Sequence, residues 1–362
     1  MTTIENILLT GKNEGQTILS FLKKYNAEQR KIFVLCNPTT QKQCLPILEQ
    51  LLQTKLSAQL IVLPIEESTK DINTCNQIWK TLLDFQADRK SVLLCLGGGV
   101  ICDIGGFVAA CFKRGIEHIL FPTTLMAQID AAIGGKTAIN FCNEKNQIGL
   151  FAPATRTIIL PEFLETLPRQ ELLSAFAEML KHGLIADRNY WKQLINININ
   201  NIEEITNKEL ILQSIKIKTT ICAKDITEDN ERKKLNFGHT IGHAIEAYLL
   251  QHNASRITHG HCVAIGMIAE TFLSQQKRLL SSDKCNIIFQ NLLSFFPIFD
   301  IRPNDYEKIV ANLQFDKKRV GANYNFTLLS DIGVAEINQQ VEREDIFKAL
   351  VFCFETLKER KK

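Results

Sequence analysis

The chain has 362 residues, of which 45% are apolar and 22% charged, a composition typical of a folded chain of about two domains. Lysine and arginine (42) nearly balance aspartate and glutamate (39), which leaves a net charge of +3. This balance argues against nucleic-acid binding and against membrane attachment through basic segments. No apolar run reaches the roughly 18–20 residues that a membrane-spanning helix needs.

The cysteine pattern indicates a reducing environment. The eleven cysteines are scattered and include no Cys-x-x-Cys pair, so neither a disulfide framework nor a thiolate zinc site is predicted. The N-terminal sequence lacks the basic flank and apolar stretch of a signal peptide. We therefore expect a cytoplasmic protein with reduced thiols.

The first 160 residues alternate short apolar runs with amphipathic stretches. The predicted strands are Lys31–Cys36, Gln59–Leu63, Ser91–Leu96, His118–Phe121 and Thr157–Leu160. The predicted helices between them lie near Gln41–Gln53, Asp71–Asp88 and Asp103–Phe112. Continuous apolar strands separated by helices indicate a parallel sheet that is covered on both faces.

After Pro161 the pattern becomes mostly helical. The helical periods are Arg169–Leu184, Ile202–Lys224, Asn236–Leu250, His261–Leu279 and Ser282–Phe295. A small hairpin is predicted from Asn325–Leu329 and Val334–Ile337. The change of pattern divides the chain into an α/β domain, residues 1–160, and a mostly helical domain, residues 161–362.

A glycine-rich turn, Gly97–Gly99, follows the third predicted strand. Glycines let the backbone approach a pyrophosphate, and a following helix offers unpaired N–H groups to it. The spacing is not Gly-x-Gly-x-x-Gly, so a tight strand-to-helix turn is the alternative. Asp103 is expected to open the helix that follows. Glu67 and Lys70 come after the second predicted strand, where the adenosine end of a cofactor would lie, or are surface charges.

A dense polar loop is predicted over residues 122–146. Gly134-Gly-Lys-Thr137 resembles the end of a P-loop, but the spacing of the first glycine fails, which excludes that type of nucleotide triphosphatase. The segment still offers two lysines, an aspartate and an asparagine after a strand, where loops of open α/β sheets bind ligands. Arg114, just upstream, is a further candidate for holding an anion. Each of these charges taken singly also suits a solvated loop.

Two segments of the second half suggest a metal site. Glu178 lies inside the apolar sequence Ala175–Leu180, where a carboxylate is costly unless it is paired or bound to a metal. Five of the seven histidines lie between residues 239 and 261, and helical periodicity places Asn236, His239, His243 and Glu246 on one stripe.

Two imidazoles and one carboxylate leave a coordination position open, as in catalytic zinc sites. Thr240 stands where a His-Glu-x-x-His metalloprotease needs glutamate, so that class is disfavoured. Core or capping histidines are the alternative. Lys218, Glu228 and Arg232 precede the stripe and suit an anionic, hydroxylated small molecule, or a solvated helix face.

These motifs together resemble 3-dehydroquinate synthases, a family of sugar-phosphate cyclases. The matching segments, in order, are Gly97–Asp103, Phe121–Leu125, Gln128–Asp130, Gly134–Asn140, Lys145–Asn146, Leu167–Glu171, Ala177–Gly183 and Leu235–Glu246. The match runs from about Leu35 to Gly333. The resemblance implies a Rossmann-like N-terminal domain and a helical C-terminal domain.

The resemblance also implies an enzyme of the shikimate pathway that converts 3-deoxy-D-arabino-heptulosonate 7-phosphate to 3-dehydroquinate and phosphate. It implies catalytic NAD, a divalent metal (zinc or cobalt) and a homodimer, with no nucleic-acid or membrane partner. The implied metal ligands are Glu178, His239 and His259. The implied NAD-binding residues are Asn37, Glu67, Lys70, Gly98, Gly99, Asp103, Thr123, Thr124, Asp130, Lys145, Thr166, Leu167 and Glu171. The implied substrate-binding residues are Asp130, Lys136, Asn146, Lys181, Lys218, Arg232, Asn236 and His243. The implied catalytic residues are Glu228, His243, Lys136, Lys181 and Arg114, the last reaching a phosphate across a dimer interface.

The chain departs from the family pattern at a few positions. Asn37 stands where the family has an acid for the adenosine ribose, and His261 replaces the glutamate of His-Gly-Glu. We expect His261 to lie beside the metal ligand without binding the metal. Three alternatives stay open: another sugar-phosphate cyclase, a metal-dependent alcohol or glycerol dehydrogenase of the same fold, and a catalytically inactive ligand-binding protein.

Overall fold

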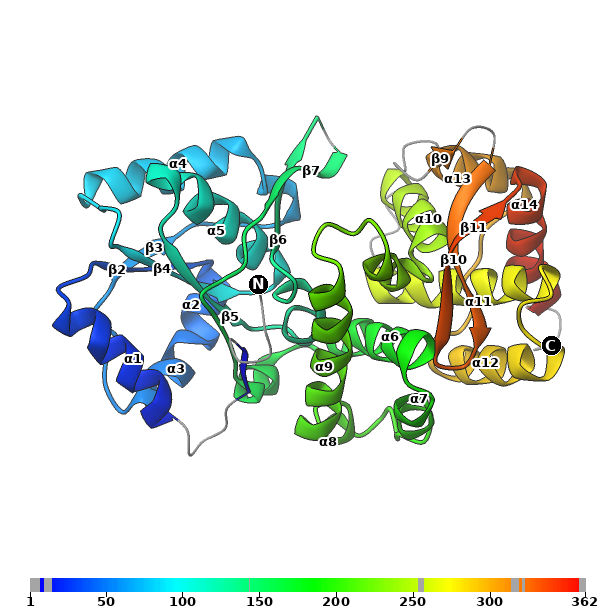
Figure 1. Ribbon diagram of the computed structural model, residues 1–362, viewed down its shortest axis with the longest axis horizontal. Coiled ribbons are helices and arrows are strands. Elements are labelled where there is room, and N and C mark those ends of the chain that lie inside the picture. The colour runs from blue at the N-terminus through cyan, green and yellow to red at the C-terminus, as the bar shows by residue number, and fades with distance from the viewer. Residues whose placement is uncertain are drawn as a thin grey trace. The chain divides into compact units, whose positions relative to one another are not determined.

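The computed structural model describes residues 7–9, 15–142, 144–252, 257–313, 319–320 and 323–357. The chain forms two compact units (Figure 1), of which the first joins Met1–Pro168 with Thr206–Ile226 and the second joins Arg169–Ile205 with Thr227–Lys362. The sequence analysis placed a single boundary at residue 160. Helix α9 (Lys208–Lys224) instead belongs to the first unit, where it packs on the short helix η4 (Ala127–Ala131).

The first unit is built on a six-stranded sheet with the order β1-β8-β5-β4-β2-β3, in which every pair of neighbours is parallel. The strands are β1 (Ile7–Leu9), β2 (Ile32–Cys36), β3 (Gln59–Val62), β4 (Val92–Gly97), β5 (Glu117–Pro122) and β8 (Arg156–Ile159). The continuous apolar runs produce this sheet because β2 and β4 are buried on both faces. The predicted parallel sheet is confirmed.

Helices cover both faces of this sheet (Figure 1). Phe33 and Leu35 of β2 pack with α4 (Ile72–Asp84) and α5 (Gly99–Cys111) on one face. Val34 and Cys36 pack with α1 (Gly15–Ala27) and α3 (Leu45–Leu52) on the other. The alternation of side chains along a strand therefore divides the apolar core into two layers. A short helix, α2 (Pro38–Gln43), connects β2 to α3.

The dense polar loop predicted for residues 122–146 is wrong in its second half. Lys136–Phe141 forms β6 and Glu144–Phe151 forms β7, and the two strands pair in an antiparallel hairpin. In β6 the buried Thr137 and Ile139 alternate with exposed or half-buried residues, whereas every residue of β7 is exposed. A fully exposed strand lacks the apolar alternation by which strands are recognised in a sequence.

The second unit is mostly helical, as predicted. Its helices are α6 (Arg169–Ala186), α7 (Arg188–Leu194), α8 (Ile202–Ile205), α10 (His239–Gln251), α11 (His259–Gln276), α12 (Ser282–Phe295), α13 (Tyr306–Asn312) and α14 (Arg343–Val351). The predicted hairpin consists of β10 (Asn323–Asp331) and β11 (Val334–Val341), with β9 (Arg319–Val320) at the edge of β10. Among the residues described, no helix is long and apolar enough to cross a membrane.

Several helix starts differ from their predicted positions. Helix α5 begins at Gly99, so Asp103 lies one turn inside it and does not open it. The predicted helix over 202–224 is divided into α8 and α9, because Asn207 caps α9 by accepting from the backbone of Glu209. Helix α10 begins at His239 and not at Asn236, because Gly238 takes a φ of 79°. Asn236 therefore ends the short helix η6 (Glu231–Asn236) and lies outside the histidine stripe.

Candidate functional site

In the first unit the glycine turn leads directly into a helix. Strand β4 ends at Gly97, Gly98 is the N-cap of α5, and no side chain caps this helix in the described part of the chain. A Cβ on Gly98 would lie 3.1 Å from Thr124 Cγ2, and one on Gly99 would lie 3.1 Å from Ala131 Cβ. The turn is thus narrow and presents open N–H groups, which is the chemistry that binds a pyrophosphate.

A buried lysine connects three of the predicted NAD and substrate residues. Lys70 is 2% exposed, and its Nζ donates to Asp103 Oδ2 and to Asn146 Oδ1, both at 2.6 Å. Burial raises the pKa of the Asp103 carboxyl, and the ammonium of Lys70 opposes that shift. The hairpin is attached to the same network, since the Asn140 N–H donates to the Lys70 carbonyl at 2.7 Å.

Further hydrogen bonds in the first unit involve Glu67, Asp130 and Lys218. The side-chain amide of Asn140 donates to Glu67 Oε1 at 2.9 Å. On α9, the buried Lys218 donates to the Asp130 carbonyl oxygen at 2.8 Å and to Asp130 Oδ1 at 2.5 Å. The structure therefore brings together Glu67, Lys70, Asp103 and Asn146 in one network, and Asp130 with Lys218 in another.

In the second unit a buried carboxylate faces an imidazole. Glu178 of α6 is 1% exposed, and its Oε1 lies 3.3 Å from Nε2 of His239. Its other oxygen forms an ion pair with Lys181, one turn further along α6. Neither carboxylate oxygen has a partner of good hydrogen-bond geometry among the described residues. A buried carboxylate placed in this way is well suited to bind a cation.

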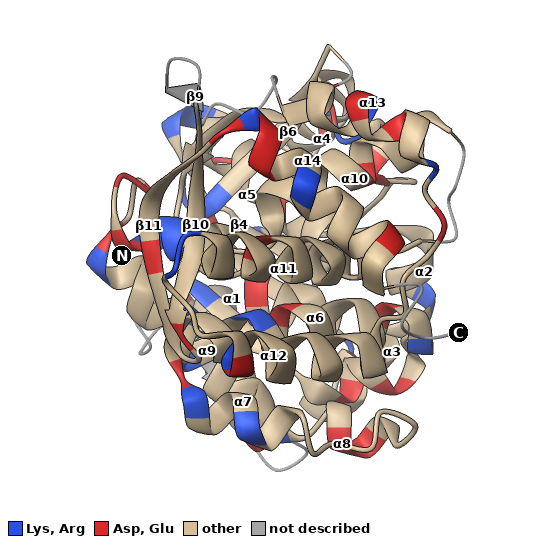
Figure 2. Ribbon diagram, turned by 90° about the vertical axis from the view of Figure 1, so that its right-hand side faces the viewer, with Lys and Arg blue, Asp and Glu red and all other residues tan. Residues whose placement is uncertain are grey.

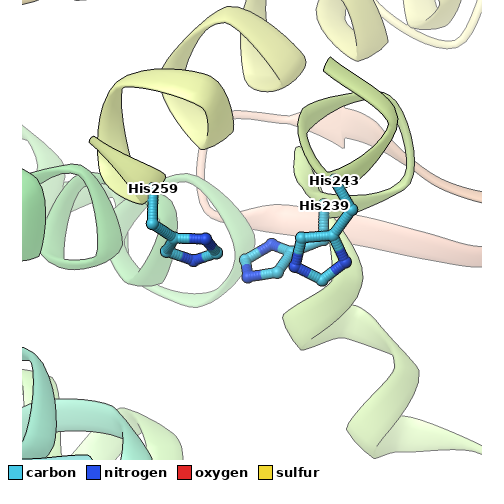
Figure 3. Close-up of side chains that lie close together, drawn as sticks. All are labelled: His239, His243 and His259. Atoms are coloured by element: carbon cyan, nitrogen blue, oxygen red, sulfur yellow. The ribbon is translucent and has the colours of Figure 1, made fainter. Parts of the chain in front are cut away.

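Three imidazoles gather beside this carboxylate and face one another (Figure 3). The ring centroids of His239 and His243 are 5.0 Å apart, and those of His239 and His259 are 5.8 Å apart. One nitrogen of each ring lies within 4.8 Å of the others. Helix α10 supplies His239 and His243 one turn apart, and α11 supplies His259 as its first residue.

The charge states in this cluster suit metal binding. Burial by itself would raise the pKa of the Glu178 carboxyl, but Lys181 and the imidazoles of His239 and His259 hold that pKa well below its usual range. Burial and the positive charge of Lys181 lower the pKa of His239. The arrangement is therefore an ionised carboxylate beside a neutral imidazole, the forms in which both groups bind a metal.

The two predicted histidine ligands are oriented through their Nδ1 atoms. Nδ1 of His259 lies 2.9 Å from Glu246 Oε2, and Nδ1 of His239 lies 3.2 Å from the carbonyl oxygen of Phe237. Because an acceptor at Nδ1 selects the tautomer that carries its proton there, both Nε2 atoms keep their lone pairs. The sequence places Glu246 on the histidine stripe but assigns it no role; its contact with His259 is seen only in the structure.

Other predicted residues of the second unit lie near the start of α10. The Asn236 side chain donates to Glu228 Oε1 at 2.8 Å. Glu228 has a φ of 67°, an uncommon conformation for a residue other than glycine. Arg232, in η6, is 2% exposed. His261 lies beside Phe296 and Phe299, with Nε2 2.7 Å from the Pro297 carbonyl oxygen.

The remaining predicted residues are not joined to these networks by the contacts described. The Asn37 side chain caps α2 by accepting from the Thr40 N–H at 2.8 Å. Arg114 is exposed in a turn where it has a φ of 68°. Lys136 and Lys145 lie on the hairpin of β6 and β7. Thr166 ends the short helix η5 (Pro161–Thr166), Leu167 follows it, and Glu171 lies in the first turn of α6. Thr123 and Thr124 follow β5, and the Thr123 N–H donates to the Gly97 carbonyl at 3.0 Å.

Solved structures define the class of fold. A 2-deoxy-scyllo-inosose synthase, crystallised with carbaglucose-6-phosphate, NAD+ and Co2+, superposes with a TM-score of 0.81 at 22% identity, covering 95% of each chain. ValA, a 2-epi-5-epi-valiolone synthase from Streptomyces hygroscopicus with NAD+ and Zn2+ bound, gives a TM-score of 0.81 at 24% identity, covering 98% of this chain and 96% of that one. The chain therefore has the fold of these synthases, and the predicted fold class is confirmed.

Sequence comparison identifies the family. Residues 60–174 match the model of the 3-dehydroquinate synthase N-terminal domain, and residues 175–319 match that of the C-terminal domain. A 3-dehydroquinate synthase from Parabacteroides distasonis is 39% identical over 345 residues, which cover 95% of this chain and 96% of that protein. The chain belongs to the 3-dehydroquinate synthase family.

Proposed function

We propose that this chain catalyses the reaction of its family, the conversion of 3-deoxy-D-arabino-heptulosonate 7-phosphate to 3-dehydroquinate and phosphate. This makes it a carbon–oxygen lyase of the shikimate pathway that uses NAD and a divalent metal. The observation that carries the proposal is the buried Glu178 carboxylate beside the Nε2 atom of His239. A sugar-binding protein without catalysis has no need for such a centre.

The proposed metal ligands are Glu178, His239 and His259. Tetrahedral zinc with bonds of about 2.0–2.1 Å keeps neighbouring ligand atoms roughly 3.4 Å apart, and the Glu178 and His239 atoms are 3.3 Å apart. His243 is the more exposed imidazole, and we assign it to the substrate. A bound zinc or cobalt ion would supply a Lewis acid for the substrate hydroxyl and carbonyl oxygens.

The proposed NAD site lies in the first unit, at the glycine turn and the Lys70 network. Because Gly98 and Gly99 have no Cβ atoms, the backbone of this narrow turn can approach a pyrophosphate closely. Glu67, Lys70 and Asp103 are assigned to the ribose and carboxamide groups of NAD, which require polar partners, and the remaining implied residues are proposed to contact NAD as well. Bound NAD supplies a reversible hydride acceptor that is regenerated within each turnover.

The proposed substrate residues are mostly cations. Arg232 and Lys218 are buried and are assigned to the carboxylate, because guanidinium and ammonium groups are the side chains that donate charge-assisted hydrogen bonds to carboxylates. Lys136, Asn146, His243 and Arg114 are assigned to the phosphate, which leaves as the C–O bond breaks and the charge on its oxygens grows. In the proposed homodimer Arg114 acts on the phosphate bound by the other subunit.

Glu228 is the proposed proton acceptor for the carbon next to the transient ketone. The amide of Asn236 donates to one of its carboxylate oxygens, which orients the other oxygen for the proton. Lys181, beside Glu178, is assigned to a substrate hydroxyl. Ring opening and reclosure by an intramolecular aldol reaction then need only that both ends of the product stay in one closed site.

The substrate carboxylate separates this proposal from another sugar-phosphate cyclase. A heptulose 7-phosphate that lacks the carboxylate is expected to have a kcat/KM roughly 100-fold or more below that of the heptulosonate, because the contacts proposed between the carboxylate and Lys218 and Arg232 would be lost. Equal turnover of both compounds, measured as phosphate release, would indicate a cyclase of different specificity.

A further inference from the structure

We propose that Glu246 and Glu270 are positioning residues that hold the two histidine ligands of the metal site, each from the helix that carries the other histidine. Glu246 lies on α10 and fixes His259 of α11. Glu270 lies on α11 and fixes the turn of α10 that contains His239. The proposal rests on the metal centre of the proposed function.

Both histidines are the first residues of their helices. His239 begins α10 and His259 begins α11. First turns of helices fray, because their N–H groups have no partner within the helix. A ligand in such a position stays in place only where something outside its helix fixes it. The backbone at the start of α11 is held by Thr258, which accepts from the His261 N–H at 3.3 Å, and by Ser174 of α6, which accepts from the Gly260 N–H at 2.9 Å. The His259 imidazole and the start of α10 are each held from the other helix.

Glu270 supplies the missing cap of α10. Its Oε2 accepts from the Gly238 N–H at 2.6 Å and its Oε1 accepts from the Ile241 N–H at 3.1 Å. These two amides lie on either side of His239. Gly238 is the N-cap residue and has no side chain to accept them itself. The buried anion also opposes the positive end of the helix dipole.

Glu270 is an unusual residue for its helix. It is the only Asp, Glu, Lys or Arg in α11, which is otherwise uncharged in Figure 2, and it is 0% exposed. Burying a carboxylate costs several kcal/mol unless its oxygens are satisfied. An apolar residue would pack in α11 without that cost. The carboxylate of Glu270 is therefore better explained by its hydrogen bonds to the first turn of α10 than by packing within α11.

The close approach of the two helices makes this contact possible. A Cβ on Gly266, one turn before Glu270, would lie 2.0 Å from the Gly238 carbonyl oxygen and 2.7 Å from the Gly242 nitrogen. The φ of 79° at Gly238 brings the chain into α10 at this point. Glycine at both positions thus brings the Glu270 carboxylate to the start of α10.

Glu246 acts on the other histidine directly. Its Oε2 lies 2.9 Å from His259 Nδ1, so the carboxylate holds the imidazole in the tautomer whose Nε2 can bind a metal. His239 has a backbone carbonyl at the same place, 3.2 Å away, and so lacks an anionic partner there. Its position depends instead on the turn held by Glu270.

The test is metal affinity, measured without substrate or NAD. Glu246→Gln, Glu270→Gln and the double variant are compared with the wild type by zinc competition against a chromophoric chelator and by the visible absorption of the cobalt form. Glu203→Gln, on the exposed face of α8 in the same unit, is the control. Thermal unfolding of the metal-free proteins reports stability separately.

Each single variant is expected to bind zinc about 10-fold or more weakly and to shift the cobalt spectrum, while the control matches the wild type. The double variant should bind zinc more weakly than either single variant, because the glutamates act on different ligands of the same metal. Glu270→Asp, which keeps both carboxylate oxygens, should recover part of the affinity lost in Glu270→Gln.

Wild-type zinc affinity and an unchanged cobalt spectrum in both single variants would overturn the proposal. A Glu270→Gln variant that unfolds at a lower temperature but binds zinc as the wild type does would overturn it for Glu270, whose role would then be structural. Absence of zinc or cobalt binding by the wild type would instead contradict the proposed function, so the two failures are distinguishable.

Discussion

Oε1 of Glu178 lies 3.3 Å from Nε2 of His239, although 61 positions separate the two residues in the sequence. The carboxylate is held ionised by Lys181 and the imidazole is neutral. This relationship makes the second unit a candidate metal centre independently of any family resemblance, because burial of this carboxylate is otherwise costly.

Replacing the carboxylate should remove the metal. Glu178→Gln keeps the shape but loses the negative charge, so zinc affinity is expected to fall at least 100-fold and turnover to be abolished. Chelator competition measures the first effect and phosphate release the second. Glu203→Gln serves again as the control. A Glu178→Gln variant that retains zinc with wild-type affinity would show that the carboxylate is not a ligand.

A side chain at Gly98 should leave the fold intact but weaken NAD binding. The backbone at Gly98, with φ −70° and ψ −170°, is accessible to valine. Its side chain would fill the narrow space beside Thr124, so Gly98→Val is expected to weaken NAD binding at least 10-fold while zinc affinity is unchanged. Isothermal titration with NAD measures this, with Thr81→Val on α4 of the same unit as the control. Wild-type NAD affinity in Gly98→Val would show that NAD does not bind at this turn.

His118 should make the protein less stable in acid. It is 5% exposed in β5, its Nε2 has no hydrogen-bond partner among the described residues, and burial lowers its pKa from the ordinary 6.5 of histidine to about 4. Between those pH values the unfolded chain binds a proton that the folded chain does not, so stability falls as the pH is lowered from about 6.5 to about 4. The loss from this group is roughly 3 kcal/mol.

The measurement is urea unfolding of the metal-free protein at several pH values, compared with His118→Leu. Other groups titrate in the same range, so the informative quantity is the difference between the two proteins. That difference should change with pH by the stated amount and level off above pH 7. A difference that is constant from pH 4 to pH 7 would mean that His118 binds its proton over the same pH range in the folded and the unfolded chain.

Much of the fold could be predicted because its strands and helices bury continuous apolar surface. The strands of the parallel sheet and the long helices of the second unit gave clear patterns. Strand β7 did not, because all of its residues are exposed. The start of α10 depends on the φ of Gly238, which periodicity does not reveal, although glycine is a common helix boundary.

The candidate site was predicted residue by residue, whereas its organisation was not. Sequence reasoning could identify Glu178 as a charge within an apolar helix. Glu270 is likewise a single charge within an apolar helix, and the same reasoning applies to it. Hydrogen bonds such as those of Lys70 with Asp103 and of Glu246 with His259 depend on the packing of separate elements, and one sequence contains no record of that packing.

The most direct test of the account is a single incubation of the purified, zinc-loaded protein with NAD and 3-deoxy-D-arabino-heptulosonate 7-phosphate. Released phosphate and the absorbance of NADH at 340 nm are followed together, since that absorbance is specific to the reduced cofactor. Phosphate is expected to accumulate through many turnovers while NADH does not. Steady accumulation of NADH, or its formation from a simple polyol without phosphate release, would identify a dehydrogenase and contradict it.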